Sequence, residues 1–325
     1  MSSTPATPSI PPADPALSAR RAAQPTPAGA AGEVRKGGWL VRIAVLVIVL
    51  LWLIPTAGVL ITSFRAEALV DAEGWWTVFT KPFDTAQWTL DNYRGALDAS
   101  GFGNAFLNSL AVALPATVIP ITIAAFAAYA FSWMEFRGRF VMFVAVVGLL
   151  VVPLQMALIP VLRLYTGGAH LFGMEIFPDL DIGGTFLGVW LAHTGFGLPL
   201  ATYLLRNYIG SLPSSIIESA KVDGADHFTI FWRLIVPLSV PALAAFAIFQ
   251  FLWVWNDLLV ATIFLGGESA NRVLTVALRE LSGSRGQDWH LLTAAAFISM
   301  SLPLAVFFSL QKYFVRGLTA GSVKG

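Results

Sequence analysis

Hydrophobic residues are concentrated in six long stretches, which shorter polar segments separate. Each stretch is long enough to cross about 30 Å of hydrocarbon at about 1.5 Å per helical residue. Because only helices and closed barrels satisfy their backbone in lipid, the pattern predicts an all-α membrane protein with six transmembrane helices. The expected spans are residues 39–64, 105–131, 139–162, 184–206, 240–265 and 291–315.

The distribution of charge predicts the orientation of these spans. Most of the 20 Lys and Arg residues lie before the first span, in the segments after spans two and four, or after the last span. Asp and Glu show the opposite bias. Since short cytoplasmic segments are enriched in Lys and Arg, both termini are expected in the cytoplasm. Residues 1–34, rich in Pro, Ala and Ser, are expected to be a disordered cytoplasmic tail, and residues 35–325 the transmembrane domain.

Composition agrees with a membrane protein and excludes several kinds of chemistry. Hydrophobic residues make up 56% of the chain and charged residues 12%, against about 25% in soluble domains. The absence of Cys excludes disulfides and thiolate sites, and the four His have no metal-ligand spacing. Dispersed basic residues argue against nucleic acid. No metal site, cofactor or enzymatic activity is expected.

One polar stretch, residues 212–241, lies between two apolar runs and is expected in the cytoplasm. Ser215 and Glu218 have the spacing of a capping box, which predicts a helix from Ile216. Gly224 is expected to end this helix, and Asp226 to cap a second helix that leads into Pro237. A short helix held at the membrane surface in this way is a candidate docking element for a soluble partner. Its predicted apolar face comprises Ile216, Ile217, Ala220 and Gly224.

The same stretch resembles the EAA loop of ABC-importer permeases, whose consensus is EAA-x3-G-x9-I-x-L-P. Here Glu218-Ser219-Ala220 is followed after three residues by Gly224 and after nine more by Leu234-Ile235-Val236-Pro237. The resemblance implies a type I ABC importer permease fold, in which residues 212–237 form a coupling loop that binds a cytoplasmic ATPase. The residues that it implies for this contact are Glu218, Ser219, Ala220, Asp223, Gly224 and Pro237.

Other motifs extend the resemblance to carbohydrate permeases of the maltose-transporter type. They are Asp91-Asn92-Tyr93, Tyr129-Ala130-Phe131, the W-x-W-N-[DE] pattern at 253–257, and the tail 316–325. The tail resembles one that reaches the ATPase dimer, which makes Gly321 and Lys324 candidate partner contacts. Segments 256–261 and 283–289 are similar to the α-glucoside branch. The resemblance implies an ATP-binding subunit dimer, a second homologous permease, an external binding protein and a sugar substrate as partners, in a bacterial inner membrane.

A polar stripe in the fifth predicted span is a candidate substrate pathway. Gln250, Trp253 and Asp257 share one face of an ideal helix, and Asn256 is adjacent. Carboxylate and amide groups can hydrogen-bond sugar hydroxyls, while an indole offers a flat apolar face. His193 in the fourth predicted span is a further candidate. These side chains could equally make structural hydrogen bonds between helices.

Two classes of transport protein fit these features. The chain has no phosphate-binding GxxxxGK[ST] motif, so a separate subunit would have to hydrolyse ATP. The alternative is a secondary carrier that uses Asp257 as a proton or cation site. Such a carrier would not need the 212–237 loop.

Overall fold

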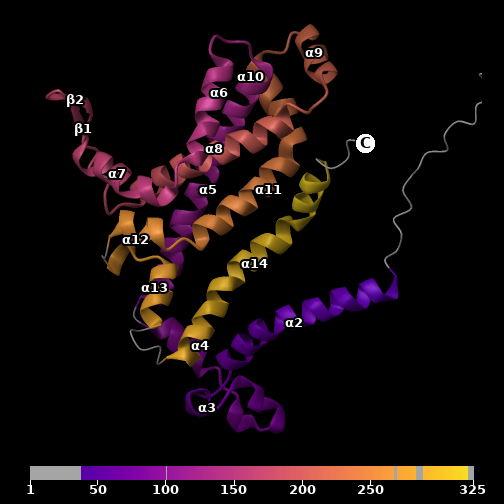
Figure 1. The fold of residues 1–325 in the computed structure, drawn as a ribbon, viewed down its shortest axis with the longest axis vertical. Helices are drawn as coiled ribbons and strands as arrows, with labels where there is room; N and C mark the ends of the chain where they lie inside the picture. The colour runs from indigo at the N-terminus through magenta and orange to yellow at the C-terminus, as the bar shows by residue number, and fades with distance from the viewer. Residues whose placement is uncertain (1–37, 100, 267–268, 283–287, 321–325) are drawn as a thin grey trace, which may run out of the picture. The chain divides into compact units, whose positions relative to one another are not determined.

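The computed structural model describes residues 38–320, apart from 100, 267–268 and 283–287, and most of this part is helical (Figure 1). The elements before the hairpin are α2 (Trp39–Ser63), α3 (Glu67–Ala72), η1 (Trp75–Thr80), η2 (Thr85–Gln87), α4 (Asp91–Asp98), α5 (Phe102–Trp133), α6 (Arg139–Gly148), η3 (Leu149–Val151) and α7 (Leu154–Gly167). Strands β1 (Ala169–Leu171) and β2 (Met174–Phe177) form an antiparallel hairpin. The elements after it are α8 (Phe186–Ile209), α9 (Ser214–Val222), α10 (His227–Ile230), the π-helical segment η4 (Phe231–Ile235), α11 (Val236–Trp255), α12 (Leu259–Leu265), η5 (Ser269–Asn271), α13 (Leu274–Leu281) and α14 (Trp289–Ala320).

The chain forms two compact units, Met1–Pro55 and Thr56–Gly325, and α2 begins in the first and ends in the second. In the first unit, the described part of α2 exposes apolar side chains on every side, including Leu50 and Trp52. A helix that is apolar all round suits a lipid environment. The predicted tail, residues 1–34, lies outside the described residues. The second unit contains every other described element.

Helices of the length and apolarity of membrane spans match four of the six predicted stretches. They are Trp39–Ser63, Phe102–Trp133, His227–Trp255 and Trp289–Gln311. The predicted fourth span corresponds to α8, which has 24 residues but a more polar composition. The mainly helical membrane fold is therefore confirmed, whereas six complete spans are not.

Two predicted spans have different boundaries in the structure. The stretch 139–162 is not one straight helix, because α6–η3 and α7 meet at a bend of 109°. Pro153 explains the bend, since proline has no N–H and forces the preceding residue, Val152, into an extended conformation (ψ 117°). The predicted span 240–265 begins earlier, at His227, and its helix ends at Trp255 before a short break and α12.

The second unit is built on close packing of α5 against α8. Small residues line α5, and Ala113, Ala116 and Ala128 are completely buried, so that the two helices approach closely. Two indoles reinforce the contact by donating across it: Trp190 Nε1 to Ala111 O at 2.9 Å, and Trp133 Nε1 to Ile209 O at 3.1 Å. This pairing supports the two regions considered below.

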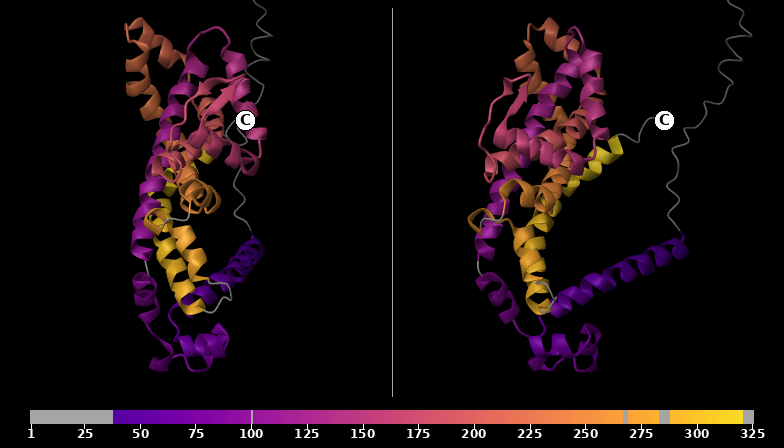
Figure 2. Two further views of the ribbon diagram at one scale, coloured as in Figure 1. Left: turned by 90° about the vertical axis from the view of Figure 1, so that its left-hand side faces the viewer. Right: turned by 60° about the vertical axis from the view of Figure 1, so that its left-hand side comes forward.

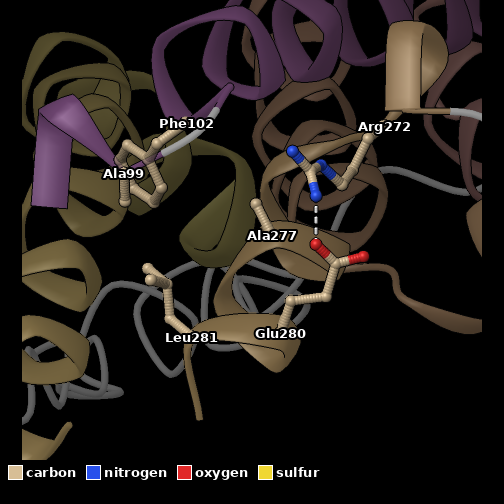
Figure 3. Close-up of a pocket in the computed structure, with 6 residues that line it drawn as sticks. All are labelled: Ala99, Phe102, Arg272, Ala277, Glu280 and Leu281. Carbon is tan, nitrogen blue, oxygen red and sulfur yellow. Dashed lines mark hydrogen bonds and ion pairs between the residues drawn. The ribbon is translucent and has the colours of Figure 1, made fainter. Parts of the chain in front are cut away.

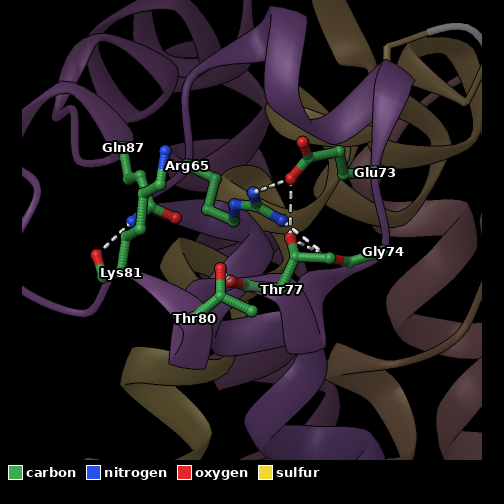
Figure 4. A network of polar contacts seen from close by, with 7 residues as sticks. All are labelled: Arg65, Glu73, Gly74, Thr77, Thr80, Lys81 and Gln87. Carbon is green, nitrogen blue, oxygen red and sulfur yellow. Dashed lines mark hydrogen bonds and ion pairs between the residues drawn. The ribbon is translucent and has the colours of Figure 1, made fainter.

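The end of α2 is fixed by a polar network around Arg65, which is 1% exposed (Figure 4). Its guanidinium donates to Gly74 O at 2.8 Å and contacts Glu73 Oε2 at 3.4 Å. The Asn92 amide donates to Ser63 O and Arg65 O, and Tyr93 OH lies 2.8 Å from Ser63 Oγ. The Asp91-Asn92-Tyr93 motif therefore joins α4 to the end of α2.

Helices α3 and α4 lie at one end of the second unit, and α9 and α10 lie at the opposite end (Figures 1 and 2). This separation agrees with the prediction that the segment between the first two spans and the 212–237 segment lie on different sides of the membrane.

Candidate functional site

The first helix of the 212–237 segment begins earlier than the capping-box motif predicts. Helix α9 starts at Ser214, and its N-cap is Pro213, which makes no side-chain capping bond. Proline has a φ suited to the start of a helix, and Ile216 N already donates to Pro213 O at 3.2 Å. The predicted capping box of Ser215 and Glu218 is therefore wrong. Glu218 lies on the exposed side of the helix instead.

The apolar face of α9 packs against the protein itself. Ile217 is 2% exposed and belongs to a buried cluster formed by α5, α8, α9, α10, η4 and α11, which Ala220 also contacts. Burial of one such side chain contributes about 1.5–3 kcal/mol. The predicted apolar docking face is therefore occupied, and a partner would meet the exposed edge. That edge contains Glu218, Ser219, Val222 and Asp223.

The predicted turn after α9 is confirmed. Gly224 has a φ of +81°, and Ala225 N donates to Ala220 O at 2.9 Å, which is the bonding of a helix that ends in a left-handed residue. A Cβ at Gly224 would have no atom within 4 Å. The backbone therefore requires glycine here, although the isolated chain has room for a side chain.

Asp226 begins the second helix, as predicted. Its carboxylate accepts a hydrogen bond from Thr229 N at 2.8 Å. Hydrogen bonds from the Thr229 side chain and backbone stabilise the ionised form, so they hold the pKa of Asp226 below its ordinary value. From this cap the helix continues through α10, η4 and α11 to Trp255.

Pro237 acts within this helix. It has no N–H for the carbonyl of Arg233, and its ring crowds that carbonyl, which accounts for the wider π-helical turn at Phe231–Ile235. Pro237 follows this turn directly. Its position in the motif is therefore explained by helix geometry.

The structure brings three of the pathway candidates together. His193 Nε2 lies 3.7 Å from Asp257 Oδ2, and the His193 ring meets the Trp253 ring edge-on at 5.2 Å between centroids. Asp257 also accepts a hydrogen bond from Ala261 N at 2.9 Å, at the start of α12. His193, Trp253 and Asp257 are called the polar cluster below.

The other two pathway candidates lie apart from the polar cluster. Gln250 is fully buried, and its amide donates to Ala116 O at 3.1 Å. It also lies against Gly197, where a Cβ would be 2.8 Å from the amide. Asn256 is exposed and donates to Leu252 O of its own helix at 2.7 Å. These bonds give Gln250 and Asn256 structural roles.

Two predicted contacts and one unpredicted pocket complete the candidate residues. Gly321 and Lys324 lie outside the described residues, so their partner contact stays a prediction. A pocket of about 180 Å³ lies beside an ion pair between Arg272 and Glu280 (Figure 3). It is smaller than the usual 300–1,000 Å³ of ligand sites and contains none of the predicted residues.

Sequence reasoning also missed a contact of the 212–237 segment. Tyr129 of α5 hydrogen-bonds His227, the first residue of α10. Tyr129 belongs to a motif that the sequence analysis noted without a role, whereas nothing near His227 indicated a partner. The two residues are 98 positions apart, so only the folded chain reveals the pair.

The fold and this segment define an inner-membrane transport component. Residues 120–320 match the family described as "Binding-protein-dependent transport system inner membrane component", and the chain belongs to this family. It is accordingly a membrane-embedded permease subunit and not a catalytic enzyme.

Two relatives and one solved structure are particularly similar. The osmoprotective compounds uptake permease protein GgtD of Synechocystis is 59% identical over 87% of this chain and 91% of its own length. The alpha-glucoside transport system permease protein AglG of Rhizobium meliloti is 46% identical over 88% and 97%. A crystal structure of a bacterial ABC transporter that imports alginate has a TM-score of 0.65 at 20% identity, covering 85% of this chain and 95% of the other.

Proposed function

We propose that this chain is the permease subunit of an ATP-driven importer of α-glucosides or related oligosaccharides. In this assignment it has six spans and cytoplasmic termini, as in a type I importer. It pairs with a second homologous permease, binds a cytoplasmic ATP-binding subunit dimer, and receives sugar from an external binding protein. Family membership and the similarity to AglG support this substrate class.

The geometry of the 212–237 segment is the observation that carries the proposal. It combines a short surface helix, a left-handed Gly224 with open space around it, and a capped second helix. Val222 is 87% exposed beside this turn. An exposed apolar side chain among charged residues suits a protein interface better than water. We assign the ATPase contact to this edge, with Glu218 pairing with a basic partner residue.

Transmission from this contact follows the helix that begins at Asp226. The run His227–Trp255 joins the docking segment to the polar cluster without a break. Ile217 and Ile230 anchor the segment in the buried cluster that also contains α5 and α8. A displacement of the segment would therefore move several spans together. ATP drives transport only as far as it binds one of the two arrangements more tightly.

The polar cluster is the proposed sugar contact of this subunit. Trp253 supplies an aromatic face, and the Asp257 carboxylate and His193 imidazole supply hydrogen-bonding groups. Both ring nitrogens of His193 are buried and make no hydrogen bond among the described residues. Such atoms are available to a hydroxyl-bearing ligand once the helices separate.

The secondary-carrier alternative rests on Asp257 alone. Family membership favours the importer, since its members depend on binding proteins. The two functions differ in their energy source. Uptake that continues after deletion of the ATP-binding subunit, and that a proton uncoupler stops, would indicate a carrier.

The substrate class is tested by uptake in cells that lack this chain and in cells with the chain restored. The panel contains radiolabelled maltose, trehalose and sucrose, with lactose as a β-linked control. Glycine betaine is included because the Synechocystis relative takes up osmoprotective compounds. Restoration of uptake for α-linked sugars alone is expected. Restoration of betaine or lactose uptake alone would contradict the assignment.

A further inference from the structure

The docking segment is joined to α5 by a hydrogen bond between two side chains. The hydroxyl of Tyr129 lies 2.8 Å from Nδ1 of His227, and the two rings meet at 69° with centroids 5.9 Å apart. Tyr129 lies one turn before the end of α5, and His227 opens α10 directly after the Asp226 cap. The bond therefore joins a central span to the first residue beyond the cap.

The two partners differ in their surroundings. Tyr129 is 4% exposed and packs edge-on against Phe231 at 5.6 Å, whereas His227 is exposed. A neutral imidazole can accept from the hydroxyl at Nδ1, and an imidazolium can donate to the phenolic oxygen. The bond can therefore form in both protonation states of His227.

Apolar packing alone does not fix the position of the segment on α5. Ile217 and Ile230 are buried against α5 and its neighbours, but hydrophobic contact is non-directional and tolerates sliding between helices. A hydrogen bond between defined atoms weakens steeply when distance or angle changes. The Tyr129–His227 pair therefore adds a fixed register to the contact.

We propose that Tyr129 and His227 form a latch that positions the docking segment on α5, so that displacement of the segment moves α5 with it. This inference rests on the proposed coupling role of the segment. Tyr129 is a positioning residue, because it lies beneath the segment and acts through His227. The latch also gives the Tyr129-Ala130-Phe131 motif a physical role.

The first test measures the latch without transport. Because the chain has no Cys, Phe228→Cys introduces one thiol, next to His227 and at a position that is 67% exposed. A nitroxide attached there in the purified complex reports the mobility of α10. Tyr129→Phe, which removes only the hydroxyl, is expected to increase this mobility. The matched control is Tyr208→Phe, which removes a hydroxyl that donates to Leu238 O at 3.3 Å between α8 and α11, and it should leave the label unchanged.

The second test measures coupling in the reconstituted importer with radiolabelled trehalose or maltose, whichever the uptake panel supports. Tyr129→Phe is expected to lower the sugar transported per ATP hydrolysed by about three- to tenfold, the range of one net hydrogen bond. His227→Leu should have a similar effect, and the double variant should be no worse than either single variant. His227→Asn, which keeps an amide near the position of Nδ1, should restore most of the ratio.

Three results would overturn the latch: unchanged label mobility in Tyr129→Phe, an unchanged transport ratio, or additive effects of Tyr129→Phe and His227→Leu. Failure of the latch is distinguishable from failure of the proposed function. Loss of uptake on substitution of Gly224 would still support docking if the latch failed. Ordinary uptake by that variant would contradict docking, whatever the label at position 228 reports.

Discussion

The docking segment and the polar cluster lie at the two ends of one helical run, His227–Trp255, yet they are built in different ways. The docking segment is formed by neighbours in sequence: Gly224 ends one helix, and Asp226 caps the next. The polar cluster joins α8 to the break after α11, so its residues meet only in the folded chain. Contact with a partner can therefore be encoded locally, whereas a pathway between spans depends on tertiary packing.

This difference predicts that the largest effect will come from Gly224. Val at this position should abolish uptake, because a Cβ would enter the space assigned to the partner. Backbone strain is the competing cause, since a left-handed conformation costs a non-glycine residue about 1–2 kcal/mol. Uptake and membrane abundance are measured together, so that failure to insert is recognised.

Two further variants separate strain from docking. Gly138 has a φ of +82°, and a Cβ there would also have no atom within 4 Å, so Gly138→Val applies similar strain outside the segment. Gly224→Asn adds bulk at a residue type that tolerates the left-handed region. Docking predicts loss in Gly224→Asn and retention in Gly138→Val. The reverse pattern would remove Gly224 from the partner interface.

The sequence predicts the docking segment well where the signals are local. The roles of Gly224 and Asp226 follow from residue type, because few residues adopt a positive φ or cap a helix. The capping-box prediction failed because Pro213 already starts α9, so Ser215 lies within the helix. Which face of α9 is buried could not be predicted either, since an apolar face can pack against its own chain or against a partner.

The polar cluster was predicted only in part, for a geometric reason. An ideal helical wheel places Gln250, Trp253 and Asp257 on one face, but the helix ends at Trp255. The position of Asp257 is therefore set by the break before α12. Gln250 points into the contact with α5 instead. His193 was a candidate by residue type, and its approach to Asp257 required the packing of α8.

The next largest effect is expected at Asp257. Asp257→Asn should raise the KM for the transported sugar about tenfold or more, because hydrogen bonds to charged groups contribute about 1.5–3 kcal/mol. Asn256→Ala is the neighbouring control, since Asn256 bonds only within its own helix among the described contacts. Equal KM values for the two variants would exclude Asp257 from the pathway.

A smaller effect is expected at Gln250, which lies on the same predicted stripe. Gln250→Met preserves length and removes the bond to Ala116 O, worth about 0.5–1.5 kcal/mol. We expect a modest fall in thermal stability in detergent and an unchanged KM. A tenfold rise in KM would return Gln250 to the substrate pathway and restore the original stripe.

The smallest effect concerns the Asp226 cap and depends on pH. The folded pKa of Asp226 is lowered by its hydrogen bonds with Thr229, so the cap stabilises the segment above the ordinary carboxyl pKa of about 4 and loses this contribution as pH falls through the lowered value. Asn caps helices about as well without titrating in this range. A nitroxide on Phe228→Cys should therefore become more mobile on acidification in an otherwise wild-type chain, and less so when Asp226→Asn is added. Identical pH profiles would show that the cap does not hold α10, which would leave the order of the docking segment to packing and to its contact with Tyr129.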